Sequence, residues 1–292
     1  MTTHAKPDYV DLSVVIPAYN EEGAIVDTVR RVQSVLTDAG INHDVVVVND
    51  GSADDTLVRA KETSARIVDL PENAGYGAAL KRGIASGNSE YVAIIDADGT
   101  YPAERLPDML KLAGDADMVV GDRGTAMKNV PIVRRPAKFI LNGLANYLSQ
   151  RKIPDLNSGL RVFNRNSLKS FIPLLPSGFS FTTTITLCML CSELRVVYTP
   201  IEYGQRVGVS KIKPTDFFSF ILLVLRVIAL FNPLRIFLPL GAILFGLGLL
   251  KLIYDLVLWN LSESAIFAFL AAIMVWSLGL IADMISRLNL RP

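Results

Sequence analysis

The stretch YVAIIDADGTYP, residues 91–102, passes from an apolar run to two carboxylates, Asp96 and Asp98, which are separated by one small residue and followed by glycine. Buried charge is costly unless it is paired or bound to a metal. We therefore expect both side chains at the open end of a strand, where a cation can reach them. Hard divalent cations prefer oxygen ligands and leave positions for the phosphates of a substrate. A lone D-x-D is weak evidence because short acidic clusters are common in loops, so the rest of the chain decides its weight.

Further apolar runs precede and follow this stretch, and they alternate with segments of helical periodicity. This pattern is typical of βαβ units that build a mostly parallel sheet in an α/β domain. In open sheets of this kind, ligands bind beyond the carboxyl ends of the strands, so the polar residues that close the runs are the site candidates. The runs are residues 12–19, 44–50, 66–70, 91–98 and 116–123, and the candidates are Tyr19, Asn20, Glu21, Asn49, Asp50, Asp96, Asp98, Asp122 and Arg123.

Composition narrows the class of protein. The 292 residues carry a formal net charge of +1, which argues against binding of nucleic acid through bulk charge. Cys188 and Cys191 lie one helical turn apart and far in sequence from His4 and His43, so we expect two small apolar residues rather than a metal or redox site. Residues 1–17 lack a basic-then-apolar leader, so no cleaved signal peptide is expected.

The last quarter of the chain contains two apolar runs, residues 236–258 and 265–285. Each is long enough to cross about 30 Å of hydrocarbon as a helix, so we predict an integral membrane protein with a two-helix transmembrane hairpin. Lys251 and Asp255 lie one turn apart toward the far end of the first run and can pair. Arginines stand outside the two runs and no basic residue lies between them. The positive-inside rule therefore predicts a cytoplasmic location for both termini and the N-terminal domain.

Two further segments are candidates for contact with a membrane surface. Residues 214–233 are dense in Phe and Leu and directly precede the first apolar run, so we expect an amphipathic helix that docks at the interface. Residues 130–152 fit a helix on anionic lipid and a core helix with solvated ends equally well. The predicted organisation is a cytoplasmic domain, an interfacial helix and a hairpin that can self-associate into a homo-oligomer, over residues 1–212, 213–233 and 234–292.

Four motifs occur in order in the first half of the chain: VVIPAYNEE, VVNDGSADDT, NAGYGAALKRG and IIDADGTYP. Through them the chain resembles the family 2 glycosyltransferases of the GT-A fold, a Rossmann-like α/β fold, over nearly all of its first 210 residues. The resemblance implies that Asp96 and Asp98 bind the diphosphate of a nucleotide sugar through Mg²⁺ or Mn²⁺. It also implies contacts to the base, ribose and remaining donor atoms from Pro17, Ala18, Tyr19, Glu21, Asp50 and Ala97.

The GYG at residues 75–77 is not a dinucleotide fingerprint, because it lacks the third glycine and does not follow the first strand. We expect it to let a helix start close to the sheet, with Lys81 facing the nucleotide.

Three later motifs, VVGDR, LNSGLRVFNR and YGQRVGVSKI, precede the hairpin. With it, they resemble the polyprenyl-phosphate glycosyltransferases, the group that contains the dolichol-phosphate mannose synthases. The resemblance implies that Arg123, Ser158 and Arg161 bind the phosphate of the acceptor lipid, and that Arg206 and Lys211, on a mobile loop, close over the donor diphosphate. Guanidinium groups suit this task because they match phosphate oxygens bidentately, although a surface ion pair is the ordinary role of any single arginine. The implied catalytic groups are Asp98, Arg123 and Arg161.

Two positions depart from the mannose synthase pattern. A glutamine that often serves as a further metal ligand is replaced by Thr100, whose hydroxyl can bind metal directly or through water. The segment FTTTITL, residues 181–187, also differs, so the mannose specificity is not carried over.

The mechanism implied by these motifs is transfer without a general base. Relatives that glycosylate a hydroxyl commonly use an Asp of a Glu-Asp pair as the base, and this chain has no Glu-Asp dipeptide. A lipid monophosphate needs no base, since its second pKa is about 6. We therefore predict direct displacement with inversion of a hexose from a GDP- or UDP-sugar onto dolichyl or undecaprenyl phosphate.

Two other functions are compatible with parts of this sequence. A processive polysaccharide synthase would share the first domain, but it would carry more membrane spans and a Q-x-x-R-W motif, and both tryptophans here, Trp259 and Trp276, lie in the hairpin region. A membrane-tethered, non-catalytic nucleotide-sugar-binding protein would share the fold. Its motif carboxylates and basic residues would be expected to erode, and here they are intact.

Overall fold

The structure is a computed structural model of the chain. It divides into two compact units, residues 1–139 with 152–214, and residues 140–151 with 215–292. The predicted boundaries after residues 212 and 233 stay predictions. The residues that the structure describes are 11–124, 143, 145–147, 150–178, 180–204, 222, 225, 227, 229–259 and 262–289.

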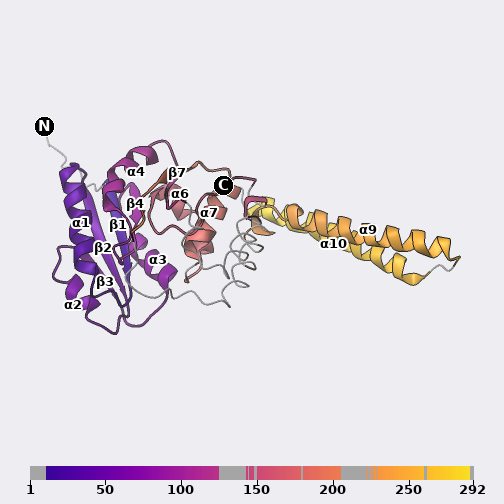
Figure 1. Cartoon of the computed structure of the whole chain (residues 1–292), viewed down its shortest axis with the longest axis horizontal. Coiled ribbons are helices and arrows are strands. Elements are labelled where there is room, and N and C mark those ends of the chain that lie inside the picture. The colour runs from indigo at the N-terminus through magenta and orange to yellow at the C-terminus, as the bar shows by residue number, and fades with distance from the viewer. Residues whose placement is uncertain are drawn as a thin grey trace. The chain divides into compact units, whose positions relative to one another are not determined.

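The first unit is built on a seven-stranded sheet with the strand order β3-β2-β1-β4-β6-β5-β7 (Figure 1). Neighbouring strands pair in parallel, except that β6 is antiparallel to both β4 and β5. The mostly parallel α/β sheet predicted from the apolar runs is confirmed, and the five runs form β1 to β5. The strands are β1 (Leu12–Ala18), β2 (His43–Asp50), β3 (Arg66–Leu70), β4 (Tyr91–Ile94), β5 (Met118–Asp122), β6 (Arg161–Asn164) and β7 (Val196–Pro200).

Helices cover both faces of this sheet. Successive side chains of a strand point to opposite faces, and those of β1 are buried on both, so each face packs against helices. Val14 of β1 packs in one core with Val29 of α1 and Met109 of α4. Val15 points the other way, toward α3, where a Cβ on Gly83 would stand 2.4 Å from its Cγ1. The helices that the structure describes in this unit, with the short 3-10 helices written η, are α1 (Ile25–Asp38), α2 (Thr56–Ala60), α3 (Tyr76–Ser86), η1 (Ala103–Arg105), α4 (Leu106–Ala113), α6 (Arg165–Lys169), η3 (Ile172–Leu174) and α7 (Phe181–Cys191).

The register of the sheet gathers the predicted site residues at one edge. Ala18, the last residue of β1, is paired with Asn49 of β2, and Val15 is paired with Ile94 of β4. All three strands run in the same direction, so the loops that follow them leave the sheet at the same edge. This is the edge at which open α/β sheets bind ligands.

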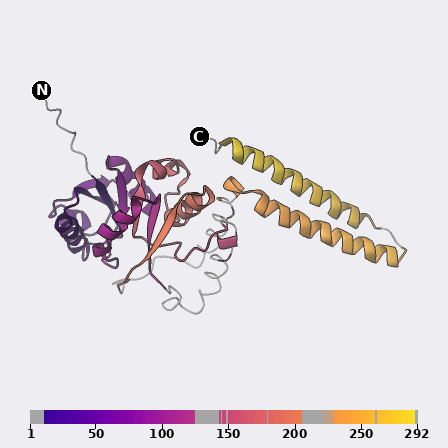
Figure 2. The same ribbon diagram turned by 90° about the horizontal axis from the view of Figure 1, so that it is seen from above.

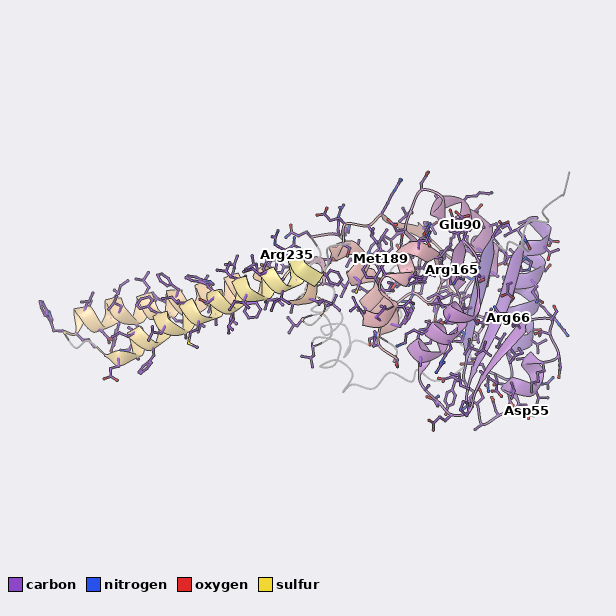
Figure 3. The ribbon with its side chains drawn as sticks, turned by 180° about the vertical axis from the view of Figure 1, so that it is seen from behind. Asp55, Arg66, Glu90, Arg165, Met189 and Arg235 are labelled. Carbon is purple, nitrogen blue, oxygen red and sulfur yellow. The ribbon has the colours of Figure 1, made fainter. Side chains whose placement is uncertain are left out.

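The second unit contains the hairpin of α9 (Leu234–Val257) and α10 (Glu263–Asn289), which lie side by side (Figure 2). The two predicted apolar runs fall on these helices. By length and composition, each helix is able to cross a membrane, and only 11% and 17% of their most apolar windows are buried. A core helix would bury this surface, whereas here apolar side chains project outward along the hairpin (Figure 3).

Small residues and one polar cluster hold the hairpin together. The Cβ of any larger residue at Gly241 would lie 2.2 Å from Nε1 of Trp276, so the helices approach closely here. The predicted Lys251–Asp255 pair is confirmed, and Asp255 also accepts a hydrogen bond of 3.1 Å from the backbone N–H of Ser262. The carboxylate therefore ties the end of α9 to the segment that leads into α10.

Candidate active site

The loops after β1 and β2 are fixed to each other by hydrogen bonds. Asn20, which has a positive φ of 55°, donates its backbone N–H to Ser52 Oγ at 3.1 Å and accepts one from Ala53 at 2.9 Å. The backbone N–H of Glu21 donates to Thr56 Oγ1 at 2.8 Å. Pro17 and Ala18 are buried at the end of β1, while Tyr19 and Glu21 are partly exposed beyond it. The predicted donor-binding residues Pro17, Ala18, Tyr19 and Glu21 thus lie in a segment that is hydrogen-bonded to the loop after β2.

Asp50 was expected to contact the nucleotide of the donor, but its carboxylate is enclosed by the protein. Its side chain is buried, and its two oxygens accept the backbone N–H groups of Ala74 at 2.8 Å and Gly75 at 3.0 Å. Gly75 has a φ of 98°, which favours glycine. Asp50 therefore fixes the segment that leads into α3 against the end of β2, and any contact with a nucleotide would be made beside these two hydrogen bonds.

The D-x-D segment lies directly after β4, as predicted, with both carboxylates partly exposed. Asp98 Oδ1 accepts hydrogen bonds from the backbone N–H of Thr100 at 3.2 Å and from its hydroxyl at 2.6 Å. The carbonyl of Ala97 accepts a hydrogen bond of 3.0 Å from Thr28 Oγ1 on α1. Thr100 is buried, so in this arrangement its hydroxyl orients Asp98.

The other carboxylate, Asp96, is enclosed more tightly. Its Oδ1 accepts a hydrogen bond of 2.8 Å from the Tyr76 hydroxyl, and a Cβ on Gly159 would lie 2.2 Å from its Oδ2. Gly159 in turn donates its backbone N–H to the Tyr101 hydroxyl at 2.7 Å. Burial and the charge of Asp96 raise the pKa of Tyr76 well above its ordinary value, so this phenol stays a donor. No residue larger than glycine fits at position 159 without moving the carboxylate.

The two carboxylates suit a hard divalent cation. Both are oxygen donors at the ligand-binding edge of the sheet, and Mg²⁺ and Mn²⁺ are commonly held by one or two carboxylates plus substrate phosphates. Within the described ranges, no third His, Cys, Asp or Glu completes a cluster with them. The residues therefore fit a metal that takes its remaining ligands from the substrate, water and hydroxyl groups.

Arg123 stands just beyond β5 and is held from one side by a carboxylate that the sequence did not indicate. Its Nε and Nη2 donate to Asp155 Oδ2 and Oδ1 at 2.6 and 2.8 Å. Its guanidinium lies 5.3 Å from the centroid of the Tyr203 ring. Although burial works against the charge, these hydrogen bonds raise the pKa of Arg123 and lower that of Asp155. Asp155 occupies the Nε–Nη2 edge of the guanidinium fork, and among the described residues no hydrogen bond from Nη1 occupies the other edge, which can receive an anion.

Arg161 and Ser158 differ from the prediction that they face an acceptor phosphate. Both are fully buried, with 0% of each residue exposed. The guanidinium donates to the carbonyls of Leu156 and Ser158, both at 2.8 Å, and to Thr186 Oγ1 at 2.6 Å. Burial lowers the pKa of Arg161. As the structure stands, neither side chain is open to a ligand, so Arg123 alone of the three predicted acceptor residues is partly exposed.

Lys81 also has a different contact from the one predicted. Its ammonium donates to the carbonyl of Leu175 at 3.1 Å and lies 3.4 Å from Ser177 Oγ. Gly77 is adjacent to the same segment, since a Cβ there would lie 2.2 Å from the carbonyl oxygen of Pro176. The start of α3 thus packs against residues 175–178, and the close approach to the sheet occurs later, at Gly83. Arg206 and Lys211, predicted to close over the donor, lie outside the described residues.

Three aromatic or acidic groups of the site were missed. Tyr76, the first residue of α3, and Tyr101 are inside quoted motifs, but a tyrosine at a helix start or in a loop carries no signal of its own. Asp155 lies three residues before Ser158 and could have been paired with Arg123 only from the fold.

The sequence matches known families over both units. Residues 13–171, more than half of the chain, match the family described as glycosyl transferase family 2. The chain belongs to glycosyl transferase family 2. Residues 232–288 of this glycosyltransferase match the GtrB C-terminal hairpin. The seven-stranded, mostly parallel domain is a GT-A fold followed by two helices able to cross a membrane.

Two relatives of this chain are named as hexose transferases, and a similar solved structure is that of a glucosyl synthase. The dolichyl-phosphate hexose transferase of Haloferax volcanii is 32% identical over 206 residues, which are 70% of this chain and 87% of that relative. The low-salt glycan biosynthesis hexosyltransferase Agl6 of the same organism is 32% identical over 68% of this chain, and the match spans only about half, 48%, of Agl6. A solved structure of glucosyl-3-phosphoglycerate synthase from Mycobacterium tuberculosis superposes with a TM-score of 0.56 at 25% identity, covering 75% of this chain and 78% of the other.

Proposed function

We propose that this glycosyltransferase moves a hexose from a GDP- or UDP-sugar to a polyprenyl monophosphate, dolichyl or undecaprenyl, at the cytoplasmic face of a membrane. The observation that carries the proposal is one chain that joins the Asp96/Asp98 pair at the end of β4 to a hairpin matching the GtrB family. Relatives named as a dolichol-phosphate mannosyltransferase and an undecaprenyl-phosphate 4-deoxy-4-formamido-L-arabinose transferase, each 28% identical to this chain, support the acceptor class.

On the donor side, the segment 17–21 with Asp50 and Ala97 would hold the nucleotide at the carboxyl edge of the sheet. Asp96 and Asp98, with Thr100 beside them, would hold Mg²⁺ or Mn²⁺, which supplies charge neutralisation for the diphosphate leaving group. The solved glucosyl-3-phosphoglycerate synthase contains Mn²⁺ and uridine-diphosphate-glucose, which supports this part of the proposal. Arg206 and Lys211 are proposed to close over the diphosphate.

On the acceptor side, Arg123 would bind the lipid phosphate through the edge of its guanidinium that Asp155 does not occupy. A phosphate oxygen forms a bond to the anomeric carbon as the bond from that carbon to the donor diphosphate breaks, so the configuration inverts and the nucleoside diphosphate leaves with the electron pair. The phosphate is already ionised near neutral pH, because its second pKa is about 6, and no protein base is required. Catalysis then depends on bringing two anionic groups together in the right geometry.

The proposed membrane orientation depends on charge. Arg235 lies in the first turn of α9 and Arg287 in the last turn of α10, so both stand at the end of the hairpin opposite the connection between the two helices. The positive-inside rule would place these ends in the cytoplasm together with the first unit.

The test is a panel of UDP- and GDP-sugars incubated with full-length protein, Mn²⁺ and either polyprenyl phosphate, with lipid-linked label as the readout. We expect one sugar per lipid with at least one donor, and loss of transfer in Asp98→Ala. Asp108→Asn, which removes an exposed carboxylate on α4, is the matched control and should keep activity. A polymeric product would favour the processive synthase, and nucleotide-sugar binding without transfer would favour the non-catalytic protein.

A further inference from the structure

Of the cations that the structure describes in the first unit, Arg161 is the most enclosed, with 0% of the residue exposed. Asp155, the carboxylate whose charge acts on it, makes its hydrogen bonds to Arg123 instead. Within the described part of the chain, its guanidinium donates to two carbonyls and one hydroxyl, and its Nη1 also lies 3.4 Å from Met118 Sδ. Burying a charge is costly unless its hydrogen bonds are satisfied. Because burying the Arg161 guanidinium costs free energy, we expect its several hydrogen bonds to hold a segment of backbone in a position that a neutral side chain would not maintain.

The object that it fixes is the 155–159 loop, composed of Asp155, Leu156, Asn157, Ser158 and Gly159. Arg161 binds the loop through the carbonyls of Leu156 and Ser158 and connects it to Thr186 on α7. The far end of the loop is Gly159, where an added Cβ would lie 2.2 Å from Asp96 Oδ2. A displacement of the two carbonyls would therefore move the backbone that limits where Asp96 can point.

The chain contains a second arginine of the same kind, which serves as an internal comparison. Arg165, just after β6, is also buried and donates to the carbonyls of Ser89 at 2.5 Å and Ile84 at 2.9 Å. Figure 3 shows Arg165 beside Glu90, whose carbonyl accepts the Arg165 backbone N–H at 3.0 Å. β6 is thus bounded by one such arginine at each end. Only the Arg161 end adjoins the D-x-D carboxylates, because Glu90 immediately precedes β4 and Asp96 follows it.

We propose that Arg161 is a positioning residue, which holds the 155–159 loop so that Gly159 fixes the Asp96 carboxylate, rather than a ligand of the acceptor phosphate. The inference rests on the proposed function, since it gives meaning to the position of Asp96 only if Asp96 takes part in binding the donor and its metal. Binding measurements without acceptor distinguish the two possible roles of Arg161. Substitution of a ligand of the acceptor phosphate would affect only the use of the lipid, whereas substitution of a positioning residue would weaken the binding of metal and nucleotide.

The experiment measures binding of UDP and GDP in the presence of Mn²⁺, by calorimetry on full-length protein without lipid, followed by steady-state kinetics with polyprenyl phosphate. For Arg161→Lys we expect Mn²⁺-dependent nucleotide binding to weaken by about 10-fold and kcat to fall, because outer partners of metal ligands commonly affect metal affinity to this extent. The KM for the lipid should stay within about two-fold. Arg165→Lys should lower the thermal midpoint by a similar amount to Arg161→Lys and leave nucleotide affinity unchanged.

A pair of threonine variants repeats the test where Arg161→Lys fails to fold. Thr184 and Thr186 are both buried on α7, and each hydroxyl donates to the carbonyl four residues earlier, but only Thr186 also accepts from Arg161. Thr186→Val should weaken Mn²⁺-dependent nucleotide binding and Thr184→Val should not. Unchanged nucleotide affinity with a raised KM for the lipid in Arg161→Lys would overturn the inference. Equal losses of affinity in Arg165→Lys or Thr184→Val would also overturn it, in favour of general destabilisation.

This design also separates the inference from the proposed function. If the wild-type protein binds Mn²⁺ and nucleotide but transfers no sugar, the proposed function fails and the binding series still decides the role of Arg161. If it binds neither, both fail.

Discussion

Arg123 and Arg161 come from the ends of neighbouring strands and were predicted to do the same work, yet their surroundings differ. Arg123 has a bidentate carboxylate partner, an aromatic ring beside it and a side chain that is 20% exposed. Arg161 is enclosed and is bound by neutral oxygens. The difference teaches that the charge of a motif residue does not define its role. The role depends on which edge of the guanidinium is left open after the protein has satisfied the rest.

Both arginines bind the same short loop, residues 155–159. Asp155, which orients Arg123, begins the 155–159 loop, and Arg161 holds the two carbonyls further along it. Gly159 then ends the loop against Asp96. The proposed donor and acceptor sides therefore share a support, and variants of this loop separate the contribution of each part.

The largest effect is expected for Gly159→Ala, where the 155–159 loop meets the Asp96 carboxylate. The added Cβ would lie 2.2 Å from Asp96 Oδ2, so the carboxylate or the loop must move. We expect kcat/KM to fall by about 100-fold, as for a misplacement of reacting groups by about 1 Å. The measurement is initial-rate transfer at saturating lipid, with Gly178→Ala as control, because a Cβ at position 178 meets nothing within 4 Å. Activity within about three-fold of wild type would show that the contact does not constrain Asp96.

The next effect should appear in Arg123→Ala and should be confined to the acceptor. We expect the KM for polyprenyl phosphate to rise by about 30-fold, the order of a lost charge-assisted hydrogen bond, with nucleotide affinity unchanged. Arg123→Lys should recover only part of this loss, because an ammonium keeps the charge but not the bidentate geometry. Arg195→Ala, at an exposed position before β7, is the control. Equal losses of donor and acceptor binding would contradict the division between the two arginines.

Much of the sheet could be predicted, because its parallel strands are buried on both faces and appear as continuous apolar runs. The carboxyl edge followed from the same pattern, so the D-x-D after β4 was placed correctly. β6 was missed because it is four residues long and begins with Arg161, a charged residue that resembled a ligand more than a strand. The partners of Arg161 could not be predicted either. One is Thr186, which lies 25 residues later, and the others are backbone carbonyls, which every residue has and which therefore leave no pattern in the sequence.

A smaller effect, with a defined pH dependence, is expected from Asp155→Asn. The Arg123 hydrogen bonds lower the pKa of Asp155, so its contribution to stability is complete above the unfolded pKa of about 3.9 and is lost as the pH falls through the folded value. At pH 7 we expect Asp155→Asn to lower the free energy of unfolding by about 1.5 kcal/mol. Denaturant titrations between pH 7 and pH 3 should show this difference from wild type shrinking as the pH falls. A difference that is constant across this range would mean that the charge of Asp155 does not stabilise the fold.

The smallest effect should come from a third arginine, which separates the influence of distance from that of burial. Arg31 Nε lies 2.5 Å from Glu104 Oε1, as close as the Arg123–Asp155 contact, but the two side chains are 54% and 50% exposed. Water screens such a pair and both side chains lose rotamer freedom on pairing, so exposed ion pairs contribute about 0 to 1 kcal/mol. Arg31→Ala should therefore change the free energy of unfolding by less than about 0.5 kcal/mol at pH 7. A loss as large as that of Asp155→Asn would show that contact distance, and not enclosure, decides what these arginines contribute.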